Sequence, residues 1–176
     1  MKKEDEVLVK KASKGDGEAF YQLMKIYKMQ LYRIALSYFR NDQDALEAIQ
    51  ETTFRAYKGI GKLKKPSYFS TWLVRILLNY CNDELRKKKR IVYNNEILHK
   101  APASEEKSSL EIDEAIELVD EKYREVIILK YLEGMKIDEI ADILEHPQGT
   151  IKTWLHKGLL SLRKQFTEDE EGDSDV

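Results

Sequence analysis

The sequence has few residues that form disulfides or interrupt helices, and it has no long apolar run that could cross a membrane. Among 176 residues there are three prolines and one cysteine. Cys81 stands alone, so it allows no internal disulfide, and a reducing cytoplasm fits this usage. The apolar run around residues 72–78 is too short to span a bilayer, and the charged N-terminus differs from a secretory signal. We expect a cytoplasmic protein without membrane insertion.

Signals for strands and for enzyme chemistry are also missing. No alternating apolar pattern persists, and the periodicity is helical throughout, which predicts an all-α protein. No nucleophile, base and acid set and no phosphate-binding loop is visible. The histidines, His99, His146 and His156, lack partners with metal-ligand spacing. The sequence therefore predicts no enzyme, no metal, no cofactor and no small-molecule substrate.

What the sequence does have is an uneven distribution of charge. Residues 55–90 hold eleven basic and two acidic side chains, a net charge of +9, although the whole chain carries −2. Residues 167–176 hold six acids and no base. Such asymmetry favours a polyanionic partner for the middle segment, and the alternative is a solvated helix end with a soluble tail.

Apolar residues at three- and four-residue steps predict three helices before residue 90. Asp16 is expected to cap the first, and Asn41-Asp42 ends it and caps the second, which runs from Asp42 to Tyr57. A loop over 59–68 leads to the third, which runs out into a basic stretch at 86–90. The inward residues are predicted to be Ala19, Phe20, Leu23, Met24, Tyr27, Leu31, Ile34, Ala35 and Tyr38, then Ala45, Ala48, Ile49, Thr52 and Ala56, then Phe69, Trp72, Leu73, Ile76, Leu77, Tyr80 and Leu85.

The periodic pattern stops after residue 90 and returns near residue 110. The small, polar residues over 91–109 indicate a flexible linker. Four shorter helices are predicted over 110–119, 121–132, 137–144 and from 147 or 148 to 166, the last with Ile151, Leu155, Leu159 and Leu162 facing inward. The acidic end should be disordered. The fold class is therefore two small helical domains, at 1–90 and 110–166, joined by a linker at 91–109 and followed by a tail at 167–176.

The second domain has the spacing of a helix-turn-helix. A short helix over 137–144, with the small Ala141 at the expected helix contact, is followed by the tight turn Glu145-His-Pro147 and a further helix. Residues 148–164 contain no acid, so this helix can approach phosphates and base edges without repulsion. An ordinary helical hairpin with a basic surface is the alternative. The outer face is predicted to carry Gln148, Thr150, Lys152, Thr153, His156 and Lys157.

Three segments resemble one known family. Residues 133–144 and 149–153 resemble the DNA-binding region 4 of bacterial sigma factors, and residues 44–57 resemble the polymerase-binding helix of their region 2. Residues 69–79, with Asp83 and Arg86, are similar to their −10 recognition helix. The small size and the absence of intervening domains match the extracytoplasmic-function (ECF) subfamily of the sigma-70 family. The resemblance covers nearly all of residues 7–165, although Leu46 stands where that family usually has an acid.

The resemblance implies an alternative sigma factor that binds bacterial core RNA polymerase and directs promoter-specific initiation on promoter DNA. It implies an anti-sigma factor as a further partner. By the same resemblance, the polymerase-binding residues are Asp44, Glu47, Gln50, Glu51 and Phe54. The −10 element would be contacted by Arg55, Leu63, Lys64, Asn79 and Arg86, and the −35 element by Gln148, Thr150, Lys152, Thr153, His156 and Lys157.

Two other interpretations remain open at this point. A stand-alone helix-turn-helix regulator would bind DNA specifically without polymerase, usually as a dimer on a palindrome. A helical adaptor would bind protein only. Trp72 and Tyr80 could stack on bases, but their helical spacing with Phe69 and Ile76 favours core positions.

Overall fold

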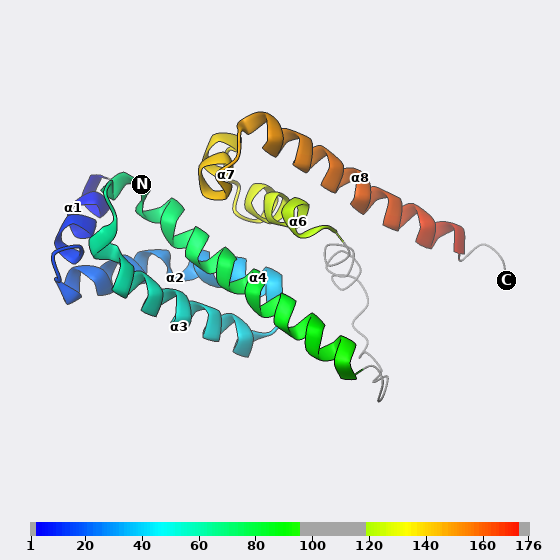
Figure 1. Cartoon of the computed structure of the whole chain (residues 1–176). Coiled ribbons are helices and arrows are strands. Elements are labelled where there is room, and N and C mark those ends of the chain that lie inside the picture. The colour runs from blue at the N-terminus through cyan, green and yellow to red at the C-terminus, as the bar shows by residue number, and fades with distance from the viewer. Residues whose placement is uncertain (1–2, 96–118, 173–176) are drawn as a thin grey trace. The chain divides into compact units, whose positions relative to one another are not determined.

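The computed structural model describes residues 3–95 and 119–172, and every regular element in these ranges is a helix (Figure 1). Two compact units meet between Lys87 and Lys88 in the sequence. The predicted all-α class with two small helical parts is confirmed. Most of the predicted linker, nearly all of the predicted helix over 110–119, and the last four residues lie outside the described ranges.

The first unit is built around α2 (Gly17–Phe39), whose apolar stripe is buried as predicted. Asp16 caps its start, since one carboxylate oxygen accepts from the Ala19 N–H at 3.0 Å. The Asn41 side chain likewise accepts from the Asp44 N–H at 3.1 Å and begins α3 (Asp42–Gly59). Caps of this kind stabilise a helix by about 1 kcal/mol each. Both predicted caps, and the predicted buried residues of both helices, are confirmed.

The sequence patterns had not singled out the first helix, α1 (Lys3–Ala12). It packs against α2 and against two short 3₁₀ turns, η1 (Ile60–Lys62) and η2 (Pro66–Tyr68) (Figure 1). Asp5 is buried in this contact and accepts a 3.4 Å hydrogen bond from the Tyr27 hydroxyl. Burial, and then the nearby Asp5 carboxylate, raise the pKa of Tyr27 to about 12.

The last helix to contribute to the first unit is α4 (Phe69–Asn95), which lies alongside α3 and continues past Lys87, the last residue of that unit (Figure 1). Its buried side includes Phe69, Leu73 and Leu77, as predicted, whereas Trp72, Ile76 and Leu85 are only half-buried. The helix continues through residues 91–95, where the linker was predicted to begin. No proline or glycine interrupts the chain between Phe69 and Asn95, so nothing local ends the helix at residue 90.

The second unit contains α6 (Glu121–Ile127), a π turn η3 (Ile128–Leu132), α7 (Ile137–Leu144) and α8 (Gln148–Gly172). α8 packs against α6 and α7 around a core that includes Val126, Ile128, Leu129, Ile140 and Ile151. The predicted bounds of α7 are confirmed, and Glu145 ends it in the left-handed conformation, φ 57°. This conformation lets the chain turn sharply into α8.

Two predictions about α8 are wrong. The helix reaches Gly172, so the first part of the predicted disordered tail is helical. No glycine or proline occurs between Gly158 and Gly172, and glutamate is a good helix former. Leu159, expected to face inward, is 38% exposed. Gly158 occupies the buried position instead, because α6 comes so close to α8 there that a larger residue would not fit.

Candidate DNA-binding and protein-binding surfaces

The residues predicted to bind polymerase lie on one side of α3. Glu47, Gln50 and Phe54 are exposed, and Asp44 and Glu51 are half-buried. Their spacing of three and four residues keeps them on one helix face, opposite the buried alanines. Phe54 is 52% exposed, and the Lys58 ammonium lies 4.0 Å from its ring centroid. An acidic face with one exposed aromatic ring can dock on a basic protein surface and bury apolar area at its centre.

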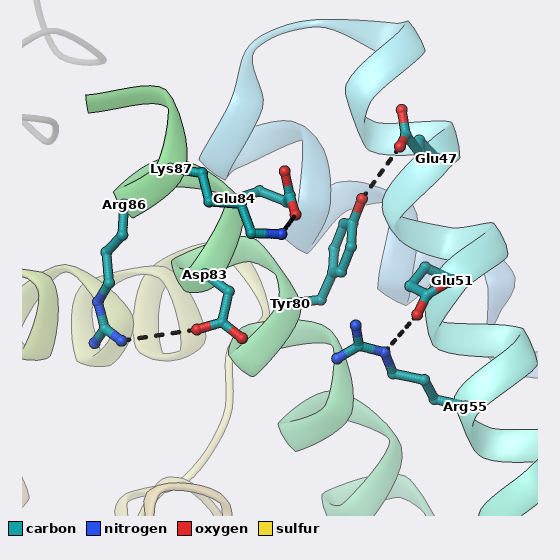
Figure 2. Close-up of polar contacts among 8 residues, drawn as sticks. All are labelled: Glu47, Glu51, Arg55, Tyr80, Asp83, Glu84, Arg86 and Lys87. Carbon is teal, nitrogen blue, oxygen red and sulfur yellow. Dashed lines mark hydrogen bonds and ion pairs between the residues drawn. The ribbon is translucent and has the colours of Figure 1, made fainter. Parts of the chain in front are cut away.

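Polar contacts link this acidic face of α3 to Arg55 on the same helix and to Tyr80 on α4, as Figure 2 shows. Glu51 pairs with Arg55 one turn further along α3, with 2.6 Å between its carboxylate oxygen and Nε. The Arg55 guanidinium lies 5.4 Å from the ring centroid of Tyr80 on α4. The Tyr80 hydroxyl in turn donates a 3.4 Å hydrogen bond to Glu47. A residue predicted to bind DNA is therefore held by one predicted to bind polymerase.

The core prediction for Tyr80 is confirmed, since the residue is 8% exposed, but its polar contacts were missed. Burial, followed by the Glu47 charge, raises the pKa of Tyr80 to about 12. The sequence holds a weak signal for this contact: Glu47, Glu51 and Arg55 recur at four-residue steps on α3. No sequence rule states which residue of α4 would meet that row.

The exposed side of α4 carries Asn79, Asp83 and Arg86, which share a face because they are four and three residues apart. Asn79 is exposed and can offer both a donor and an acceptor. Arg86 lies 3.7 Å from the Asp83 carboxylate, and Lys87 lies 2.6 Å from that of Glu84 (Figure 2). The hydrogen bond with Glu84 raises the pKa of Lys87. Ion pairs at the surface are weak, so DNA phosphates can compete with the carboxylates for Arg86 and Lys87.

The loop between α3 and α4 begins at a close contact. A Cβ at Gly59 would lie 2.9 Å from the ring of Trp72, so glycine lets α3 end against that ring. Leu63 is half-buried and Lys64 is exposed, which leaves both within reach of a ligand. Ile60, in η1, is buried in the core, so of the two aliphatic residues of this loop, Ile60 and Leu63, only Leu63 remains accessible.

The predicted DNA-reading residues of the second unit lie on the outer side of α8. Gln148, Lys152, Thr153, His156 and Lys157 are exposed, and Thr150 is half-buried. The Thr153 hydroxyl donates to the Gly149 carbonyl at 2.9 Å within the helix. Trp154 is half-buried and packs edge-on against His146 of the turn, with ring centroids 4.6 Å apart. The turn therefore braces the start of the exposed, acid-free face.

Gly158 fixes the distance between α8 and α6, and sequence reasoning missed this role. A Cβ at this position would lie 2.8 Å from Cδ1 of Ile127 and 3.1 Å from Cβ of Tyr123. The missing side chain at Gly158 therefore lets α6 and α8 approach closely. In the same unit, Leu129 is buried, whereas Leu132 at the end of the π turn is exposed.

Within residues 3–95 and 119–172, no group of three or more histidine, cysteine or acidic side chains could hold a metal ion. In the same residues, no helix is long and apolar enough to cross a membrane.

The chain matches the Sigma-70 region 2 family over residues 23–91 and the Sigma-70, region 4 family over residues 109–162. It is 35% identical to the ECF RNA polymerase sigma factor SigW of Bacillus subtilis, over 90% of this chain and 94% of the relative. Among solved structures, it resembles CnrH, solved in complex with the cytosolic domain of CnrY. That likeness has a TM-score of 0.72 and 23% identity and covers 94% of this chain and 98% of the other.

It also resembles the sigma factor RpoE of Bartonella quintana, solved with the anti-sigma factor NepR. In that case the TM-score is 0.67 and the identity 21%, over 84% of this chain and 96% of the other. The two structural likenesses concern the fold alone. The SigW match spans nearly the full length of both proteins, and the two family matches lie in the same order as the two units of this structure. The chain belongs to the ECF sigma factors of the sigma-70 family.

Proposed function

We propose that this chain binds core RNA polymerase and directs transcription initiation at promoters that carry a particular −10 and −35 element. The main support is the occurrence, in one ECF sigma chain, of an acidic exposed face on α3 and an exposed, acid-free face on α8. The first suits a basic protein partner and the second suits DNA. Polymerase and DNA share the bacterial cytoplasm, so we place its action there.

The polymerase contact is assigned to the outward side of α3. The half-exposed Glu51 and the exposed Glu47 supply charge, and Phe54 supplies an apolar centre that loses water on docking. Aromatic side chains, phenylalanine included, are enriched at the buried centre of protein interfaces. The proposed residues are Asp44, Glu47, Gln50, Glu51 and Phe54.

The −10 contact is assigned to the loop after α3 and to the exposed side of α4. Asn79 has an amide that can read a base edge, while the basic side chains neutralise phosphates and give affinity without sequence choice. Leu63 offers apolar surface to a base removed from its stack. The proposed residues are Arg55, Leu63, Lys64, Asn79 and Arg86.

The −35 contact is assigned to the first three turns of α8. Its start can bind a phosphate through free backbone N–H groups, and the exposed side chains that follow can reach the major groove. The proposed residues are Gln148, Thr150, Lys152, Thr153, His156 and Lys157. Two tethered units that bind neighbouring DNA elements raise each other's effective concentration, so each contact can be weak alone. We divide the chain at 1–90 and 110–166, and the linker predicted at 91–109 begins with the helical end of α4, which runs to Asn95.

We further propose an anti-sigma partner, because the RpoE chain that this one resembles was solved with the anti-sigma factor NepR. A protein that covers the α3 face would compete directly with polymerase. No catalytic activity is proposed for the chain itself.

The deciding experiment is run-off transcription with purified core polymerase, the full chain and genomic promoter fragments. We expect transcripts with defined start sites that are absent when the chain is left out. A stand-alone regulator would bind its DNA equally well without polymerase. Failure to join core polymerase, or joining without start-site selection, would overturn the proposal.

A further inference from the structure

Tyr80 of α4 lies at the contact between α3, which carries the proposed polymerase contact, and α4, which carries part of the proposed −10 contact. The residue is buried, at 8% exposure, its hydroxyl donates a partly buried hydrogen bond to Glu47, and the Arg55 guanidinium lies over its ring face. Figure 2 shows the ring between the two α3 side chains. A residue needed only to fill the core would not require a hydroxyl at this point, because leucine or phenylalanine fills such space without a polar atom.

Arg55 is held by contacts from two directions. Glu51, on its own helix, binds Nε at 2.6 Å, and the Tyr80 ring, on the neighbouring helix, lies 5.4 Å from the guanidinium carbon. An ion pair alone leaves a long side chain free to swing about the carboxylate. A ring face in addition restricts the plane of the guanidinium, since arginine stacks on aromatic faces. The Arg55 side chain is 44% exposed, so its outer side remains accessible.

Glu47, Glu51 and Arg55 form a row along α3 at four-residue spacing, and Tyr80 contacts its first and third members. We propose that Tyr80 is a positioning residue that holds Arg55 in the orientation used to contact the −10 element. Its hydroxyl fixes the ring by bonding to Glu47, and the ring then fixes Arg55. This inference rests on the proposed function for Arg55, but the positioning itself can be measured without DNA.

The first experiment measures the Arg55 side chain in the free full-length chain by NMR relaxation of its Nε–H group. We expect Tyr80→Leu to lower the order parameter of this group, because the ring face is lost. Tyr80→Phe keeps the ring but removes the hydrogen bond to Glu47, so it should lower the order parameter less than Tyr80→Leu does. Tyr27→Leu is the matched control, since it removes a buried tyrosine of the same unit that contacts Asp5 and Phe69 rather than Arg55.

An unchanged order parameter in Tyr80→Leu would overturn the proposal, as would an equal loss in Tyr27→Leu, which would indicate general loosening of the unit. A fall in Tyr80→Phe equal to that in Tyr80→Leu would also overturn the role given to the ring. Thermal unfolding of each variant checks that the chain remains folded at the temperature of the measurement.

The second experiment measures binding of −10 DNA by the assembled holoenzyme in a double-mutant cycle. Cation–π contacts at exposed sites correspond to about a two- to fivefold change in affinity. We expect Tyr80→Leu to weaken binding by this factor when Arg55 is present and to have no effect when Arg55 is already alanine. Equal losses in both backgrounds would mean that Tyr80 acts through the core and would refute the positioning role.

The two experiments separate this inference from the proposed function. If Arg55→Ala leaves −10 binding unchanged while Tyr80→Leu still loosens the Arg55 side chain, the positioning stands and the DNA contact of Arg55 is wrong. If Arg55→Ala weakens binding but Tyr80→Leu neither loosens the side chain nor weakens binding, the DNA contact stands and the positioning is wrong.

Discussion

Replacement of Gly158 by alanine should destabilise the second unit, although the same change usually stabilises a helix. The added Cβ would lie 2.8 Å from Cδ1 of Ile127 and 3.1 Å from Cβ of Tyr123. The isoleucine methyl can swing away, but the tyrosine Cβ moves only with the backbone of α6. Overpacking of this kind costs about 1–3 kcal/mol, whereas alanine in place of glycine within a helix contributes about 1 kcal/mol. We expect a net loss of up to about 2 kcal/mol.

Gly149 supplies the matched control, because it lies in the same helix and a Cβ there would meet nothing within 4 Å. Gly149→Ala should leave stability unchanged or raise it by up to about 1 kcal/mol. The difference between the two variants, about 1–3 kcal/mol, then measures the clash at Gly158 alone. In a domain of this size, 1 kcal/mol corresponds to a shift in Tm of about 4–8 °C.

Unfolding can be followed by the fluorescence of Trp154 in a Trp72→Phe background, since the chain has two tryptophans. The signal then reports on the second unit. Gly158→Leu should lower the Tm further, because several more atoms would enter the same contact. Equal stability of the Gly158→Ala and Gly149→Ala variants would refute the close approach of α6 and α8.

The remaining predictions concern binding and titration. Lys157→Ala should weaken transcription from promoters with a good −35 element and reduce the salt slope of DNA binding by about one; unchanged output would remove Lys157 from the contact. Asn79→Ala should lose about 1–3 kcal/mol of discrimination at the −10 element with polymerase binding intact, whereas loss of polymerase binding would indicate a structural role. Glu51→Ala should raise the Kd for core polymerase by about fivefold, or about 1 kcal/mol, and a titration at wild-type affinity would contradict this. Tyr80, with its pKa raised to about 12 from 10.0, contributes stability that is present below pH 10 and lost as the pH rises through 12. An ultraviolet difference titration against Tyr80→Phe should locate this pKa, and Glu47→Gln should lower it only in part, because burial is the larger cause.

Much of the fold followed from local rules. The stripe that contains Leu31 and Ile34 needs only the 3.6-residue period, and the caps at Asp16 and Asn41 need only a side chain that accepts a hydrogen bond from a free N–H. The turn at Glu145 was equally local, because its neighbours mark the end of one helix and the start of another. Such features depend on residues within a few positions, which the sequence presents directly.

Features that depend on the distance between helices were beyond the same rules. Gly158 is a poor helix former by propensity, and only the approach of α6 explains why it stands in the middle of α8. The error at Leu159 has the same origin, since Gly158 rather than Leu159 faces α6 at the close contact. The binding residues were named from a family resemblance, and the periodicity alone predicted only that most of them would be exposed.

The pairing between Tyr80 and the α3 row was likewise non-local. Its two partners, Glu47 and Arg55, lie 33 and 25 positions earlier in the chain, so no spacing rule links them. The α1 helix was missed for another reason. Its charged residues obscure a short apolar set, of which Val9 and Ala12 are buried, and the buried Asp5 contacts Tyr27 far along the chain.

The unbroken helix between Asn79 and Arg86 keeps these two residues at a fixed spacing. At 1.5 Å per residue the two positions are separated by about 10 Å along the axis, close to three base steps of a nucleic acid duplex. Insertion of a single residue between them would turn one end by about 100° relative to the other and separate Asn79, proposed to read a base, from Arg86, proposed to bind a phosphate. The length of this segment would then set the position of the bound chain along the promoter. Evolution could replace residue 79, and so change the base that is preferred, without changing that position.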